Sequence, residues 1–136
     1  GIDGAMALYR EILAEIAGER PVLVVSIPPA YRIDPAWRER VRDVYPELAS
    51  ADHDAVDRAL ADLCRELGIP FLPLVEPLEA LAAEGGNVYF TGDGHLSPPG
   101  QMRAGEAVAA RVGALARGLS ALAESRKESV DHVEAR

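Results

Sequence analysis

The sequence has few of the features that mark disulfide-stapled, membrane-spanning or nucleic-acid-binding proteins. Cys64 is its one cysteine, so neither an intrachain disulfide nor a site built from several thiolates is available within one chain. No apolar run approaches the roughly 18 residues that a membrane-spanning helix needs. Lys and Arg number 14 against 22 Asp and Glu, and the resulting net charge of -8 argues against a nucleic-acid partner.

The chain nevertheless has the composition of a folded protein. Its 136 residues are enough for one domain with a hydrophobic core, and 49% of them are hydrophobic. Aromatic residues make up only 5%, which favours helices that pack closely through small side chains. We expect a domain over residues 1–120, followed by a charged C-terminal tail over residues 121–136.

Apolar residues recur with helical or strand spacing along most of the chain. Helices are expected over residues 3–18, 35–44, 53–67, 76–83 and from 98 to about 119. Extended segments are expected at residues 21–27, 69–75 and 88–90. Because strands alternate with helices, and the run 21–27 is apolar on both faces, the order predicts an α/β fold around a parallel sheet.

The first and last helices each carry an apolar stripe, and we expect the stripe of the last helix to face inward. Three strands are few for a parallel sheet, and the first helix has no strand before it. We therefore expect an open strand edge at residues 22–27, to be completed by a missing N-terminal half or by a second chain. The stripe residues are Met6, Tyr9, Ile12, Leu13 and Ile16 in the first helix, and Met102, Val108, Val112, Leu115 and Leu119 in the last.

The segment after the third extended run holds the best candidates for chemistry. Asp93 and His95 lie two residues apart in a loop with glycines at positions 92 and 94, and Ser97 is placed to cap the helix that begins at Pro98. A histidine is the side chain best suited to act as a general base near neutral pH, and a neighbouring carboxylate can orient it. We therefore predict a catalytic pair of His95 and Asp93. The alternative is that Asp93 forms the turn and His95 is a surface residue.

The segment Tyr89-Phe90-Thr91-Gly92-Asp93-Gly94-His95-Leu96-Ser97-Pro98-Pro99-Gly100 resembles the last conserved block of the SGNH hydrolases, also called GDSL-type esterases and lipases. The Ala-rich start of the final helix and the strand ending Ser26-Ile27-Pro28-Pro29 are also similar to that family. The resemblance covers about the C-terminal half of such a domain. It implies a flavodoxin-like three-layer α/β/α sandwich and a Ser-His-Asp mechanism on an ester, with His95 as the base and Asp93 as its orienting group.

Two features depart from the family pattern. The spacing here is Asp-x-His, whereas Asp-x-x-His is commoner in the family. The shorter form resembles a variant in polysaccharide acetyl-esterase and O-acetyltransferase-like branches, so both hydrolysis and acyl transfer on acylated carbohydrate are implied. The Gly-Asp-Ser nucleophile block and the blocks that supply oxyanion donors are absent from these residues. Ser26, at the carboxyl end of a predicted strand, is an alternative nucleophile, although no glycine turn follows it to expose its hydroxyl.

Other interpretations of these residues remain open. Asp93 and His95 could join Asp52, His53 or Asp54 as metal ligands, but the spacing matches no specific site, and we expect no metal or cofactor. Tyr31, Arg32 and Trp37 either line a substrate cleft or pack against a neighbouring helix. The expected partner is a small-molecule or carbohydrate ester. The alternative from another class is a non-catalytic α/β binding or scaffold domain. Nothing in the sequence indicates a compartment.

Overall fold

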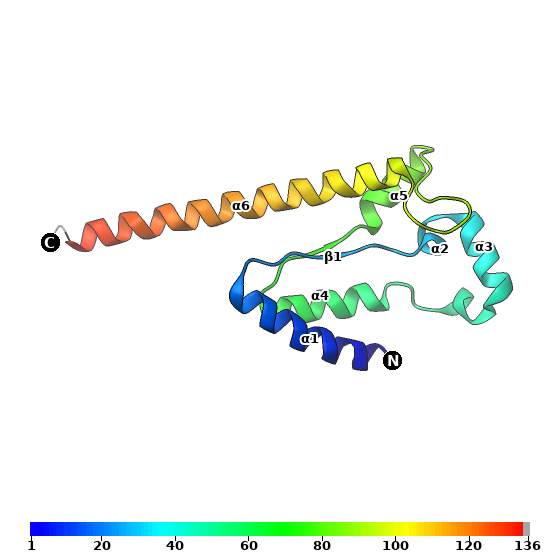
Figure 1. The fold of residues 1–136 in the computed structure, drawn as a ribbon, viewed down its shortest axis with the longest axis horizontal. Helices are drawn as coiled ribbons and strands as arrows, with labels where there is room; N and C mark the ends of the chain where they lie inside the picture. Colours follow the sequence, from blue (N-terminus) through cyan, green and yellow to red (C-terminus); the bar gives the residue numbers. More distant parts are fainter. Residues whose placement is uncertain (135–136) are drawn as a thin grey trace.

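The computed structural model describes the backbone of residues 1–134 and their side chains except at 49–50, 123 and 125–134. Helices dominate, and a short parallel sheet lies between them (Figure 1). In chain order the elements are α1 (Ile2–Glu19), β1 (Val24–Ser26), α2 (Ala30–Ile33), α3 (Pro35–Val44), the 3-10 helix η1 (Pro46–Ser50), α4 (Ala55–Leu67), β2 (Phe71–Pro73), α5 (Val75–Ala83) and α6 (Pro98–Glu134).

Several helix ends follow directly from the local sequence, as predicted. The Asp34 carboxylate accepts hydrogen bonds from the backbone N–H groups of Ala36 and Trp37, so it caps α3. Gly68 ends α4 in the left-handed conformation, with φ 67°, which a glycine adopts without steric cost. Ser97 caps α6, since its Oγ accepts from the backbone N–H of Gly100. The predicted start of α3, end of α4 and start of α6 are therefore confirmed.

The sheet in residues 1–134 has two strands, β1 and β2, paired in parallel with Val24 opposite Phe71. Helices cover both of its faces (Figure 1). Successive strand residues point to opposite faces, so Val24 packs against the side of α1 and α4, and Val25 packs against the side of α5 and α6. The coarse prediction of an α/β fold with a parallel strand pair is therefore confirmed.

Each face has its own hydrophobic core, and we name them by their helices. The α5–α6 core also includes two residues of α2, and the α1–α4 core includes the residue that follows Gly68. The buried members of the α5–α6 core are Ala30, Ile33, Leu74, Leu78, Leu81, Val88, Tyr89 and Ala104, and those of the α1–α4 core are Leu13, Leu63, Cys64 and Ile69.

The prediction of a third extended segment in the sheet, over residues 88–90, is wrong. Tyr89 forms an isolated antiparallel bridge with Leu96 and does not join β1 or β2. The backbone N–H of Phe90 donates to the His95 carbonyl, and that of Ser97 donates to the Val88 carbonyl. The segment therefore folds back on the loop that follows it, because its backbone groups are satisfied by that loop.

The last helix differs from its prediction in length and in burial. α6 continues past the predicted domain boundary at residue 120 as far as Glu134, and its C-terminal part extends away from the rest of the molecule (Figure 1). Residues 135–136 of the predicted tail lie outside the described residues. Met102, Val112 and Leu119 are exposed, so the prediction that they face inward is wrong. The two-stranded sheet is too narrow to cover them.

The stripe on α1 is only partly buried. Leu13 belongs to the α1–α4 core, but Tyr9, Ile12 and Ile16 of the same stripe are exposed. The helix predicted over residues 3–18 is confirmed, because Ile2–Glu19 is helical. Within the described residues, this side of the helix has no surface to pack on.

In residues 1–134 no helix is long and apolar enough to cross a membrane.

Candidate functional site

The loop over residues 91–96, which we call the Asp93–His95 loop, is held over the carboxyl end of β1. The Tyr89 hydroxyl donates a hydrogen bond of 2.6 Å to the carbonyl of Pro28, which follows that strand. Tyr89 itself is 2% exposed, and burial raises the pKa of its hydroxyl to about 12. This buried phenol ties the residues before the loop to the edge of the sheet where ligands bind in open α/β folds.

Helix α3 holds the same loop from a second side. The Trp37 indole N–H donates to the Phe90 carbonyl at 3.3 Å, and an Arg40 guanidinium nitrogen donates to the Thr91 carbonyl at 2.8 Å. The Arg40 guanidinium carbon also lies 4.8 Å from the centre of the Trp37 ring, within cation–π range. Trp37 therefore holds the loop, a contact that neither interpretation from sequence included. Arg40 was missed from the sequence, although its position three residues after Trp37 on a helix could have indicated it.

Glycine is required at two places around the loop. Gly94 has φ 71°, a conformation that residues with a Cβ rarely adopt, and it lets the chain reverse between Asp93 and His95. At Gly100, in the first turn of α6, an added Cβ would collide with the Val88 carbonyl oxygen. The start of α6 thus lies directly against the segment that leads into the loop.

Asp93 and His95 face each other as the sequence suggested. The Asp93 Oδ1 atom lies 3.3 Å from His95 Nδ1 and accepts a hydrogen bond of 3.0 Å from the His95 backbone N–H. The backbone N–H of His95, followed by its ring, holds the pKa of the Asp93 carboxyl below its usual range. The two side chains are 61% and 82% exposed, so solvent reaches the pair. The geometry is that of a carboxylate able to orient an imidazole, just beyond the 2.6–3.2 Å of a strong hydrogen bond.

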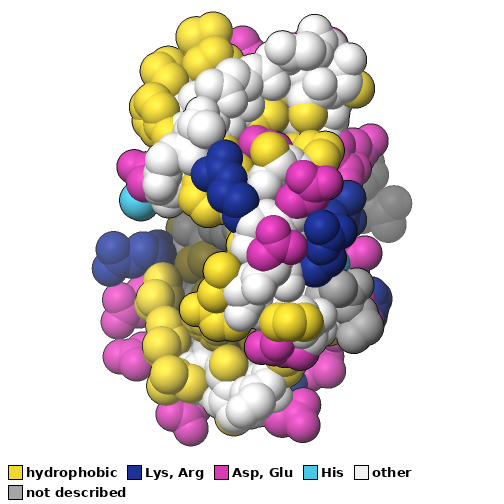
Figure 2. Space-filling model, turned by 90° about the vertical axis from the view of Figure 1, so that its right-hand side faces the viewer, with side chains coloured by type: hydrophobic (Ala, Val, Ile, Leu, Met, Phe, Trp, Pro, Cys, Tyr) yellow, Lys and Arg dark blue, Asp and Glu magenta, His cyan; other side chains and the backbone are white. Residues whose placement is uncertain are grey.

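The end of the molecule that carries this loop has a mixed surface. Hydrophobic, basic and acidic side chains all reach it, and the acidic ones are spread more widely over this face than the basic ones (Figure 2). The structure leaves the imidazole open to incoming molecules, and Nε2 is the ring nitrogen that does not face Asp93. A proton acceptor at Nε2, oriented through Nδ1, is what this arrangement can provide.

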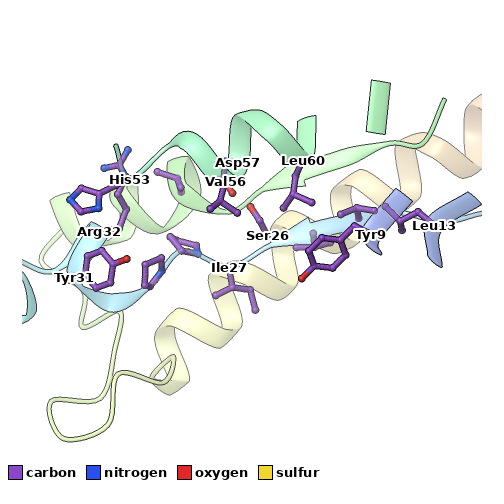
Figure 3. Close-up of a pocket in the computed structure, with 15 residues that line it drawn as sticks. Tyr9, Leu13, Ser26, Ile27, Tyr31, Arg32, His53, Val56, Asp57 and Leu60 are labelled. Atoms are coloured by element: carbon purple, nitrogen blue, oxygen red, sulfur yellow. The ribbon is translucent and has the colours of Figure 1, made fainter. Parts of the chain in front are cut away.

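A separate hollow of about 450 Å³ lies beside β1, between α1 and α4 (Figure 3). Ser26 points into it toward α4, and Tyr9 and Leu13 of α1 line its far end. The Ser26 Oγ atom is buried and has no hydrogen-bond partner among the described residues. Neither Asp93 nor His95 is among the residues that line the hollow, so the structure does not bring Ser26 to the predicted pair.

Tyr31 and Arg32 lie near this hollow and have structural contacts. The Arg32 guanidinium pairs with Asp54 at 2.9 Å and with Glu79 at 3.0 Å, which ties α2 to α4 and α5. The Tyr31 ring lies 5.3 Å from the His53 ring, at an angle of 60°. Both residues also line the hollow, and whether it receives a substrate stays a prediction.

The acidic residues before α4 have ion-pair partners. Asp52 pairs with Arg58, and this hydrogen bond lowers the pKa of the Asp52 carboxyl. Asp54 forms an ion pair with Arg32. Across the described side chains, no three His, Cys, Asp or Glu residues gather in a way that could hold a metal ion. The structure thus gives no support to the metal interpretation that joined these residues to Asp93 and His95.

Comparison with known proteins does not add an identification. No family model matches the chain, and no curated protein or solved structure does.

Proposed function

We propose that this chain is the C-terminal part of an SGNH-type serine acyl-ester hydrolase, with His95 as the general base and Asp93 as its orienting group. One observation carries the proposal. Asp93 Oδ1 lies 3.3 Å from His95 Nδ1 while the imidazole stays 82% exposed, in a loop bound over the carboxyl end of β1. The fold that accompanies this proposal is a flavodoxin-like three-layer α/β/α sandwich, supported by a parallel strand pair with helices on both faces.

The proposed chemistry follows from the orientation of the ring. With Nδ1–H donated to Asp93, the Nε2 lone pair takes the proton of a serine hydroxyl as the serine oxygen attacks the ester carbonyl carbon. The imidazolium then returns that proton to the departing alcohol. Water, activated in the same way, releases the acid and restores the serine. The Asp93 carboxyl, whose pKa lies below its usual range, is ionised at neutral pH and can accept the Nδ1 proton's hydrogen bond.

The serine and the oxyanion donors are proposed to come from outside these residues. Ser26 does not lie with the pair, and the described sheet stops at two strands. A missing N-terminal half, or a second chain, would supply the nucleophile and widen the sheet. The proposed substrate is a small-molecule or carbohydrate ester. The residues around His95 do not identify its alcohol or its acyl group.

The test is ester hydrolysis by the full-length polypeptide, measured with p-nitrophenyl acetate. His95→Ala should lower turnover on the order of 10⁴-fold or more, because members of a triad act as a unit. His53→Ala is the matched control, since the His53 ring lies against Tyr31 and not in the Asp93–His95 loop. Its turnover should stay within a few-fold of the unchanged protein.

Two outcomes would contradict the proposal. A full-length protein indifferent to His95→Ala would favour the non-catalytic α/β binding or scaffold domain. Hydrolysis by the 136-residue chain alone that disappears in Ser26→Ala would instead make Ser26 the nucleophile.

A further inference from the structure

The composition and the burial of β1 disagree. The segment around β1 is apolar on both faces, as in inner strands of parallel sheets, yet all three of its residues are only half-buried. The hydroxyl of Ser26 is buried without a partner among the described residues, beside a hollow of about 450 Å³. A strand with the sequence of an inner strand thus has the surroundings of an edge strand.

The backbone of β1 identifies which of its groups are unpaired. The Val24 N–H donates to the Pro70 carbonyl, and the Ser26 carbonyl accepts from the Leu74 N–H, so these two residues face β2. Backbone groups alternate in direction along a strand, so Val25 points its N–H and carbonyl to the opposite edge, as do Leu23 and Ile27. This edge has no proline to block a ladder between residues 23 and 27.

The outer edge of β2 is different. By the same alternation, Phe71 and Pro73 face away from β1, and Pro73 has no N–H to donate. Proline is one of the devices that prevent a further strand from pairing at an edge. The two edges of the sheet are therefore not equivalent, and the β1 edge is the one suited to accept a strand.

The position of α1 indicates where such a strand comes from. α1 and α4 pack on the same face of the sheet, in one core. Strand–helix–strand crossovers between parallel strands are right-handed in nearly all cases, so helices on the same face carry the chain in the same direction across the sheet. Because α4 leads from β1 to β2, a strand that enters α1 must lie on the other side of β1, at its unpaired edge.

We propose that the β1 edge is the docking site of a parallel β-strand that precedes α1 in the full-length polypeptide. This inference rests on the proposed function only in assigning the chain to a longer protein. The N-terminus of α1 lies toward the same end of the molecule as the carboxyl end of β1 (Figure 1), so a strand ending there runs parallel to β1. Its side chains enter the hollow beside Ser26 and cover the apolar side of α1.

Amide hydrogen exchange in the full-length polypeptide, resolved by residue, tests the docking. The amides of Val25 and Ile27 should be protected to a similar degree as that of Val24, which pairs with β2. Val24 is the internal control in the same sample. Fast exchange at Val25 and Ile27 with a protected Val24 would overturn the proposal, as would a mature polypeptide that begins at Gly1.

A matched pair of variants tests whether the docked strand buries the side of α1 that carries Tyr9. Tyr9 and Tyr45 are 47% and 54% exposed, but Tyr9 lines the hollow and Tyr45 lies at the end of α3. In the full-length polypeptide, Tyr9→Glu should lower the urea midpoint of unfolding by about 1 M, since it buries a charge under the docked strand. Tyr45→Glu should leave the midpoint nearly unchanged. Equal midpoints for the two variants would overturn the proposal.

Separate measurements show which polypeptide supplies the docked strand and whether His95 is catalytic. Protection of Val25 that rises with protein concentration, together with a dimer mass in solution, would show that a second copy occupies the edge, and would overturn the assignment to the same polypeptide. The hydrogen-exchange protection of Val25 and Ile27 does not depend on His95. If His95→Ala leaves ester hydrolysis unchanged, the docked strand can still be shown by that protection, and if the protection is absent, catalysis by His95 can still be shown by the hydrolysis assay.

Discussion

The two faces of the sheet differ in how completely their cores are closed. In the α5–α6 core, Leu78 and Tyr89 are 0% and 2% exposed, and the Asp93–His95 loop follows directly after Tyr89. On the opposite face, Leu13 is buried, but Tyr9 and Ile12 beside it on α1 remain exposed. An apolar stripe on a helix therefore shows which residues need a cover, and it does not show that the cover lies within the same 136 residues.

The largest expected difference between the two faces is in the cost of removing an apolar side chain. Leu78→Ala should destabilise the chain by about 2–5 kcal/mol, because it leaves a cavity in a closed core. Ile12→Ala removes an exposed side chain and should cost less than about 1 kcal/mol. Urea unfolding of both variants measures this comparison. Similar losses of stability would show that the two faces are equally closed.

A smaller effect is expected at the phenol that connects the closed core to the loop. Tyr89→Phe removes the hydrogen bond to the Pro28 carbonyl and should cost about 1 kcal/mol at pH 7. The folded state raises the pKa of Tyr89 to about 12, from about 10 when unfolded, so its neutral form favours folding. That contribution is complete below about pH 10 and is lost as the pH rises toward 12.

Urea unfolding across pH 9–12 checks this dependence. The unchanged chain should lose stability more steeply with pH than Tyr89→Phe does. Tyr45→Phe, at an exposed tyrosine, is the control and should keep the steep slope. A slope that is the same with and without the Tyr89 hydroxyl would contradict the view that this phenol anchors the loop.

The smallest expected effect on stability, and the most informative about the site, is at Asp93. Its lowered pKa means that the carboxylate contributes stability above its usual titration range, and that this contribution is lost as the pH falls through the lowered value. Because the pair is exposed, Asp93→Ala should barely change the stability at pH 7. Its effect should appear in the histidine ring.

Nitrogen NMR of the His95 ring at neutral pH or above measures that effect. In the unchanged chain the neutral ring should carry its proton on Nδ1, which faces Asp93, and Asp93→Ala should shift the proton toward Nε2. The His53 ring should be the same in both proteins. A proton on His95 Nε2 from the start would show that Asp93 does not orient the ring.

The sequence determined the local structure because the signals for it are local. Asp34, Gly68 and Ser97 define helix ends through side-chain or backbone hydrogen bonds within a few residues, and all three were predicted. The facing of Asp93 and His95 was predictable for the same reason, since the two residues are joined by one glycine. The parallel order of the strands followed from the alternation of strands and helices.

Only the tertiary structure decided where the loop lies and what remains uncovered. Contacts between residues more than 50 positions apart hold the loop, such as those from Trp37 and Arg40, and no periodicity in the sequence indicates them. The short run at residues 88–90 has strand propensity, but its backbone groups pair with its own loop and not with the sheet. The stripes on α1 and α6 predicted helices correctly. Whether they are buried depends on the width of the sheet between them, which long-range pairing decides.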